Sequence, residues 1–157
     1  MTKSALWLVA SLTIAVSGCV RTATNEATGK IDVDVESPTK RGEDWKGELK
    51  GREMYASVRG TTRALYADGR TSVTVRLENA RAGATFWWDL REGRCGSGGG
   101  VLGSASSYTA LNVGNDGRAG VTVTIMARLD EAKTYSVTVY GSSSDMTNIV
   151  ACGDLDD

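Results

Sequence analysis

The residues best able to do chemistry lie in two short segments, residues 88–95 (WDLREGRC) and residues 149–155 (IVACGDL). Each segment contains one cysteine, and the first also carries a carboxylate and a guanidinium at alternate positions, Asp89 and Arg91. The chain contains no histidine, which is the commonest metal ligand and the usual proton shuttle near neutral pH. It therefore lacks the easiest route to metal catalysis or to a hydrolytic triad.

The elements that must position these residues are short strands. After residue 44, apolar and polar residues alternate and turn signals such as Asp68-Gly69 recur at short intervals, while no segment shows a capped helical period. Seven or so strands at this spacing predict an all-β fold, an antiparallel Greek-key sandwich or flattened barrel. We expect strands at residues 55–66, 73–77, 85–91, 111–113, 121–125, 135–139 and 149–152.

The N-terminus has the pattern of an export signal. Lys3 precedes the mostly apolar residues 5–16, which are too few to span a bilayer as a helix. The following Val-Ser-Gly-Cys resembles the bacterial lipobox, which implies removal of residues 1–18 and acylation of Cys19. Val20, in place of an aspartate, is similar to the pattern of outer-membrane lipoproteins. The alternative is an ordinary secretory signal followed by a chance cysteine.

Residues 19–44 are polar, contain the only proline and lack bulky side chains, so we interpret them as a disordered tether to the membrane. The tether would lead into a single β-domain at residues 45–157. Residues 31–35 (IDVDV) alternate like a strand and leave two alternatives open. They could pair with a sheet edge, or bind a cation through three carboxylates, Asp32, Asp34 and Glu36.

The charge pattern argues against a nucleic-acid partner. The formal net charge is −1, and no basic stripe or nucleic-acid motif occurs. The glycine- and serine-rich residues 96–107 have neither the lysine nor the following helix of a phosphate-binding loop. We expect no cofactor.

The cysteine count favours one disulfide. With Cys19 assigned to lipid, Cys95 and Cys152 remain as an even pair in an oxidising compartment, where pairing is the default. On the chain-entropy account such a bond would stabilise the domain by about 4 kcal/mol.

The order of these parts resembles the copper,zinc superoxide dismutase fold and its short bacterial relatives. In that family a Trp-His-x-His strand is followed by a glycine, a cysteine and a glycine-rich loop, and the second cysteine lies in a terminal Ala-Cys-Gly. This chain has residues 88–95, then GSGGG at 96–100, and Ala-Cys-Gly at 151–153. The resemblance covers roughly residues 55–155. It implies an immunoglobulin-like to superoxide dismutase-like sandwich with Cys95 bonded to Cys152.

The functional positions of that family are all replaced here. Its two histidines in the first motif correspond to Asp89 and Arg91, and the histidine ending the Tyr-x-Val-x-Val strand corresponds to Tyr140. The arginine that guides superoxide corresponds to Ile149, and residues 96–107 contain no His, Asp or Glu. The resemblance therefore implies a retained scaffold that binds no metal and has no dismutase activity.

Asp89 and Arg91 project from the same strand face, opposite Trp88 and Leu90. They could fill the space of the lost metal with Tyr140 nearby, but we favour a solvent-exposed face on which such pairs contribute little.

Trp87 shares the face of Asp89, Arg91 and Tyr140. This group could form an amphipathic surface that binds carbohydrate or protein. Alternatively, we expect Trp87 to be covered by the tether or by the segment around Trp45.

Together these features predict a non-enzymatic envelope lipoprotein, anchored at the outer membrane through Cys19 and facing either the periplasm or the outside. Its β-domain would be a binding, accessory or structural module for an envelope protein or glycan. The alternative is a metal-handling or redox protein with a site that uses no histidine.

Overall fold

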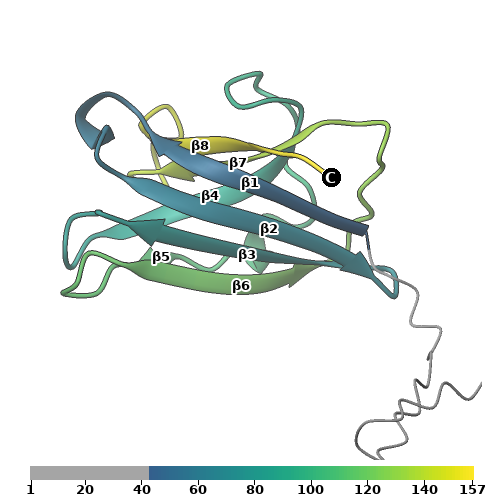
Figure 1. Ribbon diagram of the computed structural model, residues 1–157, viewed down its shortest axis with the longest axis horizontal. Coiled ribbons are helices and arrows are strands. Elements are labelled where there is room, and N and C mark those ends of the chain that lie inside the picture. The colour runs from purple at the N-terminus through teal and green to yellow at the C-terminus, as the bar shows by residue number, and fades with distance from the viewer. Residues whose placement is uncertain (1–42) are drawn as a thin grey trace, which may run out of the picture. The chain divides into compact units, whose positions relative to one another are not determined.

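Eight strands form the framework of the computed structural model, which describes residues 43–157 (Figure 1). Two single-turn 3-10 helices, Glu53–Tyr55 and Ala105–Ser107, interrupt them, and the all-β prediction is confirmed. The strands are β1 (Glu43–Gly51), β2 (Arg59–Ala67), β3 (Arg70–Glu78), β4 (Thr85–Glu92), β5 (Leu111–Asn112), β6 (Ala119–Ile125), β7 (Tyr135–Tyr140) and β8 (Ile149–Leu155).

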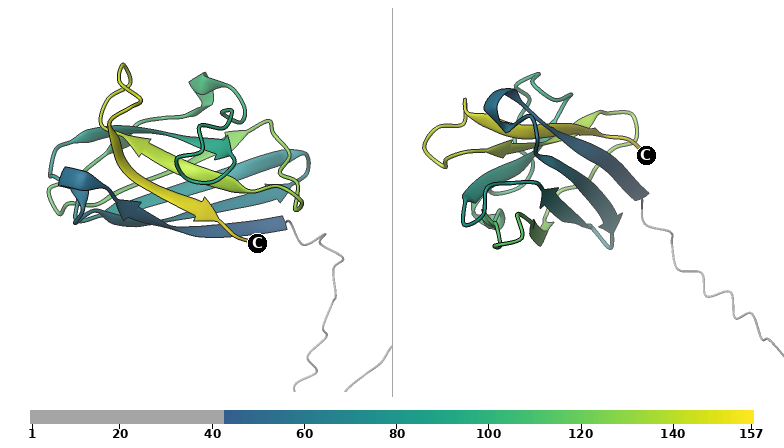
Figure 2. Two further views of the ribbon diagram at one scale, coloured as in Figure 1. Left: turned by 90° about the horizontal axis from the view of Figure 1, so that it is seen from above. Right: turned by 60° about the vertical axis from the view of Figure 1, so that its left-hand side comes forward.

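The strands form one antiparallel sheet in the order β5-β4-β7-β8-β1-β2-β3-β6. Crossovers bring β7 beside β4 and β6 beside β3, which is the Greek-key style of connection that the sequence predicts. The sheet curls on itself until its two edge strands, β5 and β6, come into contact (Figure 2). The result is a nearly closed, flattened barrel.

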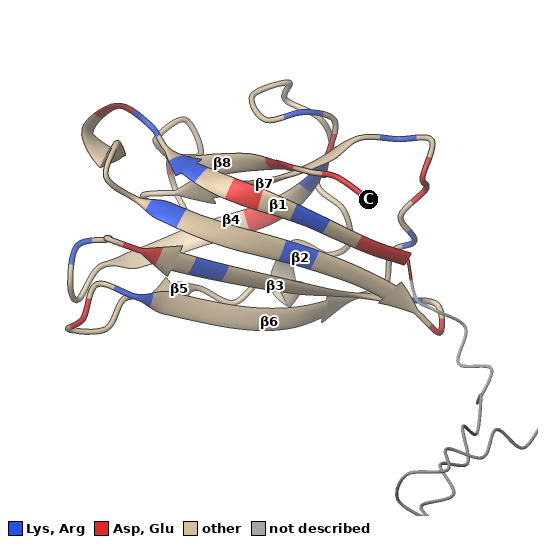
Figure 3. Ribbon diagram, viewed as in Figure 1, with Lys and Arg blue, Asp and Glu red and all other residues tan. Residues whose placement is uncertain are grey.

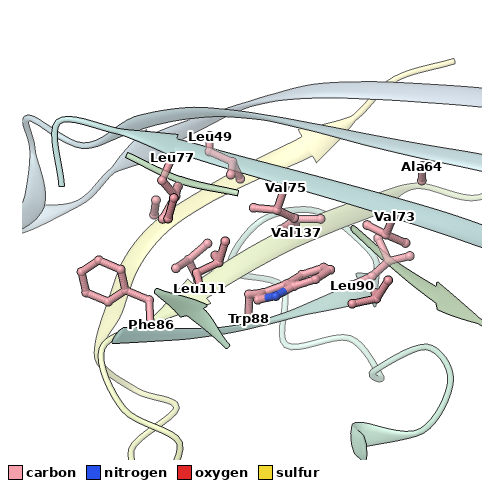
Figure 4. Packing of buried hydrophobic residues seen from close by; sticks show 14 of the residues in the cluster. Leu49, Ala64, Val73, Val75, Leu77, Phe86, Trp88, Leu90, Leu111 and Val137 are labelled. Atoms are coloured by element: carbon pink, nitrogen blue, oxygen red, sulfur yellow. The ribbon is translucent and has the colours of Figure 1, made fainter. Parts of the chain in front are cut away.

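Alternation of buried and more exposed residues, clearest in β3, builds much of the core. In β3, Val73, Val75 and Leu77 are buried while their neighbours are more exposed, and in β4, Phe86 and Trp88 point the same way. Side chains from β3 and β4 fill the same interior space (Figure 4). The Trp88 indole is held in place by a hydrogen bond from Nε1 to the Thr109 carbonyl oxygen (2.8 Å) and by edge-to-face packing on Tyr108.

The first strand differs from the prediction. β1 begins at Glu43, so the sheet starts two residues before the predicted domain start at residue 45. Trp45 is buried in the core and packs edge-on against Tyr135. The hypothesis that the Trp45 segment covers Trp87 is therefore wrong, because Trp45 points into the barrel.

Several sequence predictions lie outside the described residues. These are the signal peptide at residues 1–18, the lipid site Cys19, the tether up to residue 42, and the alternatives for residues 31–35 with Asp32, Asp34 and Glu36. Among residues 43–157 there is no helix long and apolar enough to cross a membrane.

The first and last described strands, β1 and β8, approach each other very closely. Their backbones pair at Lys50 with Cys152, and again where the amides of Lys46 and Asp156 donate to each other's carbonyl oxygens (2.7 and 2.8 Å). Between these points, a Cβ atom on Gly153 would collide with the Glu48 carbonyl oxygen. Glycine at this position allows β1 and β8, neighbours in the middle of the sheet, to approach closely along what we call the β1–β8 seam.

We predict that Gly153→Ala destabilises the domain by about 2 kcal/mol or more, because backbone rather than a movable side chain occupies the space. Urea unfolding would measure the loss. Gly100→Ala is the matched control, since its Cβ meets no atom within 4 Å, and it should change stability by no more than about 0.5 kcal/mol. Equal stability of the two variants would contradict this account of the seam.

Candidate functional site

The predicted disulfide is present. Cys95, in the loop after β4, is bonded to Cys152 in β8, with the Cα atoms 5.8 Å apart. The Cys95 amide donates a hydrogen bond to Asp154 Oδ1 (2.6 Å), and Arg52 Nη2 donates one to Cys95 Sγ (3.0 Å). The bond therefore ties the glycine-rich loop to the last strand of the barrel.

The outer face of β4 and β7 brings the predicted site residues together. In the antiparallel register Trp87 lies opposite Tyr140, and Asp89 lies opposite Thr138. Arg91 donates to both carboxylate oxygens of Asp89, from Nε to Oδ1 (2.9 Å) and from Nη2 to Oδ2 (2.9 Å). The Tyr140 hydroxyl donates to Asp89 Oδ1 (3.1 Å). We call Asp89, Arg91 and Tyr140 the Asp89 cluster.

The Asp89 cluster is closed rather than solvent-exposed. The side chain of Asp89 is only 8% exposed and that of Arg91 is 24% exposed, while Tyr140 is buried. The favoured prediction of a solvent-exposed face for Asp89 and Arg91 is therefore wrong for Asp89, while Arg91 is partly buried. The reason is that Arg91 folds back over the carboxylate, with its guanidinium 5.9 Å from the Tyr140 ring centre, and also donates to the Gly99 carbonyl oxygen (3.0 Å).

Hydrogen bonding, burial and nearby charge within the Asp89 cluster maintain the protonation states of Arg91 and Tyr140. The hydrogen bond to Asp89 raises the pKa of Arg91, and burial, together with the nearby Asp89 charge, raises the pKa of Tyr140. The guanidinium thus stays charged and the phenol stays protonated. Both oxygens of the carboxylate are already used by donors inside the protein.

Trp87 and Ile149, the other two positions discussed in the sequence analysis, flank the Asp89 cluster. Trp87 is partly buried beside Tyr140, so its exposed portion remains available to a partner. Ile149, at the position that corresponds to the guiding arginine, pairs with Tyr140 across β7 and β8. An apolar side chain therefore stands where the resemblance would place the anion-attracting charge.

The glycine-rich loop is fastened to the open edge of β4. The Glu92 amide donates to the Gly100 carbonyl oxygen (3.0 Å), and the Leu102 amide donates to the Leu90 carbonyl oxygen (2.9 Å). The Tyr108 hydroxyl donates to the Leu102 carbonyl oxygen. Within the described part of the chain, no group of three or more His, Cys, Asp or Glu side chains is arranged to hold a metal ion.

A groove that the sequence did not predict runs along the outer face of β1, β2 and β8. Its volume is about 930 Å³, and the Cys95–Cys152 bond and several basic side chains line it. Basic positions occur on the adjacent strands β1, β2 and β3 (Figure 3). They lie on different strands, and the strand register places them side by side; the alternation of charge in β1 was the one local signal.

No protein-family model and no curated protein matches this sequence. The case for a function therefore depends on two features of the described residues. One is the Asp89 cluster, which is closed and internally satisfied. The other is the open groove on the neighbouring part of the sheet.

We predict that Asp89→Val lowers the free energy of unfolding by about 3 kcal/mol, because it leaves the Arg91 guanidinium partly buried without its carboxylate. The double variant Asp89→Val with Arg91→Leu should lose less unfolding free energy than Asp89→Val alone, since no unpaired charge remains. Urea unfolding of the wild type, both single variants and the double variant measures the coupling. Additive losses would show that the two side chains act independently.

Alkaline pH should destabilise the domain through Tyr108. Burial raises its pKa to about 12, from an ordinary value near 10. Between about pH 10 and pH 12 the unfolded chain loses this proton while the folded protein keeps it, so stability falls as the pH rises through that window. Tyr108→Phe should make the unfolding free energy less dependent on pH there. If Tyr108→Phe left the pH dependence of the unfolding free energy unchanged between about pH 10 and pH 12, the assignment to Tyr108 would be wrong.

Proposed function

We propose that the protein is a non-enzymatic envelope lipoprotein, held at the outer membrane by lipid on Cys19. Its domain would be a degenerate superoxide dismutase-like barrel that serves as a binding or accessory module. This proposal combines the lipobox-like sequence before Cys19 with the geometry of the Asp89 cluster.

The observation that carries the proposal is the state of Asp89. By resemblance, Asp89, Arg91 and Tyr140 stand at positions of metal-binding histidines. Here one carboxylate receives two hydrogen bonds from Arg91 and one from Tyr140. Recruiting this carboxylate to a metal would require breaking a partly buried ion pair, which is costly. The local chemistry therefore favours a structural role for the former site.

A binding role is supported by the surfaces that stay open. The groove along β1 and β2 has exposed polar side chains, and part of Trp87 is accessible beside the closed cluster. Interfaces of soluble domains often use such an aromatic residue next to polar groups. An envelope protein or glycan is the expected class of partner.

One contact favours the alternative of a redox protein without a histidine site. Arg52 lies 3.0 Å from Cys95 Sγ, and a guanidinium at this distance would stabilise a thiolate if the disulfide were reduced. Cys95 is also the more exposed of the two cysteines.

We predict that cells fed labelled palmitate incorporate it into the wild-type protein and not into Cys19→Ser, because the acylated residue is missing. The variant should also leave the membrane fraction. Cys95→Ser is the control for loss of a different cysteine, and it should keep the label. Label retained by Cys19→Ser would refute the lipid anchor.

The binding role is tested separately, by a photocrosslinking residue in place of Trp87 in intact cells. Capture of one specific partner supports a binding module. Self-crosslinks alone would contradict it and indicate a protein that coats or spaces the envelope.

A further inference from the structure

Four basic residues converge on the outer face of the barrel from separate elements. Lys50 lies in β1, Arg52 directly after it, Arg59 in β2 and Arg76 in β3, and all four are exposed. Lys50 is directly opposite Arg59 in the sheet, and Arg76 is opposite the exposed Thr61. We call these four residues the cationic cluster.

The cationic cluster is not neutralised by its surroundings. Between residues 43 and 157, none of its four side chains forms an ion pair with a carboxylate, whereas Lys46 and Arg63 on the same face both pair with Asp44 (3.0 and 2.7 Å). Like charges directly opposite each other in a sheet, such as Lys50 and Arg59, are unfavourable. A sheet that keeps this arrangement has an excess of positive charge available to a ligand.

Nearby carboxylates reduce this excess but do not cancel it. Glu48 and Glu78 share the face, and Glu78 is already near Arg118 (3.8 Å). On the β8 side, Asp154 and Asp156 also line the main groove. An anionic ligand would therefore be repelled from β8 and held over β1, β2 and β3.

The shape of this face suits an extended chain. The main groove follows β1 from Lys46 to Arg52, and a second groove, which contains Arg59, adjoins it at Lys50 and Arg76. Neither groove is lined by an aromatic side chain, although such rings are the usual platform for a sugar. Three carboxylates along the main groove also disfavour a nucleic acid, whose phosphodiester backbone carries a negative charge at every nucleotide.

We propose that the cationic cluster binds an acidic, extended peptide segment of a partner protein. Alternate residues of an extended peptide present side chains about 7 Å apart on one side. Acidic residues at that spacing match cations two positions apart, such as Lys50 and Arg52, while the exposed Thr61 hydroxyl can donate a hydrogen bond. Binding of the peptide would involve only the barrel and would not require lipid on Cys19.

The test uses the full chain in detergent and a fluorescent peptide in which Asp alternates with Ser. Fluorescence anisotropy should show binding that weakens as salt is added, because the attraction is between exposed charges. Arg52→Gln with Arg76→Gln should raise the dissociation constant about tenfold or more. Lys50→Gln alone should act in the same direction.

Arg70→Gln with Arg128→Gln is the matched control. It removes the same charge from exposed positions outside both grooves, and it should leave binding nearly unchanged. The same peptide with Asn in place of Asp should not bind. Urea unfolding verifies that each variant is folded.

Three results would overturn the proposal. The first is equal weakening by the control pair, which would indicate attraction to net charge alone. The second is absence of binding to the acidic peptide at low salt. The third is tighter binding to vesicles of anionic lipid than to the peptide, with the same dependence on Arg52 and Arg76, which would identify a membrane surface.

Discussion

A buried carboxylate must have its charge balanced inside the protein, and the outer face of β4 and β7 is arranged around this need at Asp89. Arg91 supplies two hydrogen bonds from the same strand, β4, and Tyr140 supplies a third from the neighbouring strand, β7. The guanidinium also reaches Gly99, so the same charge pair holds the glycine-rich loop against β4. The Asp89 cluster thus organises both a strand pair and a loop.

The neighbouring β1–β8 seam is held together by other features. Gly153 lets β8 approach β1, and the Cys95–Cys152 bond fastens the loop after β4 to the same strand. These features leave the outer face of β1, β2 and β3 uncovered by any other described element of the chain. The β1–β8 seam and the closed Asp89 cluster thus coexist with an open, charged groove.

Much of the fold was predictable because its signals are local. Alternation places Val73, Val75 and Trp88 in the core, and the cysteine count favours the disulfide once Cys19 is assigned to lipid. β1 escaped prediction because glycines and charged residues dilute its alternation, so that only Trp45 and Leu49 mark its buried side.

The site was only partly predictable. The sequence indicates the shared face of Asp89 and Arg91, but not that Arg91 folds back and closes it, since this depends on Tyr140 and Gly99. The cationic cluster depends on strand register, which pairs Lys50 with Arg59 and places Arg76 opposite Thr61. The proposal that the Asp89 cluster replaces a metal site is tested most directly by metal analysis of protein purified from native cells. This account predicts copper, zinc and iron far below one ion per chain, and a stoichiometric amount of any of them would contradict it.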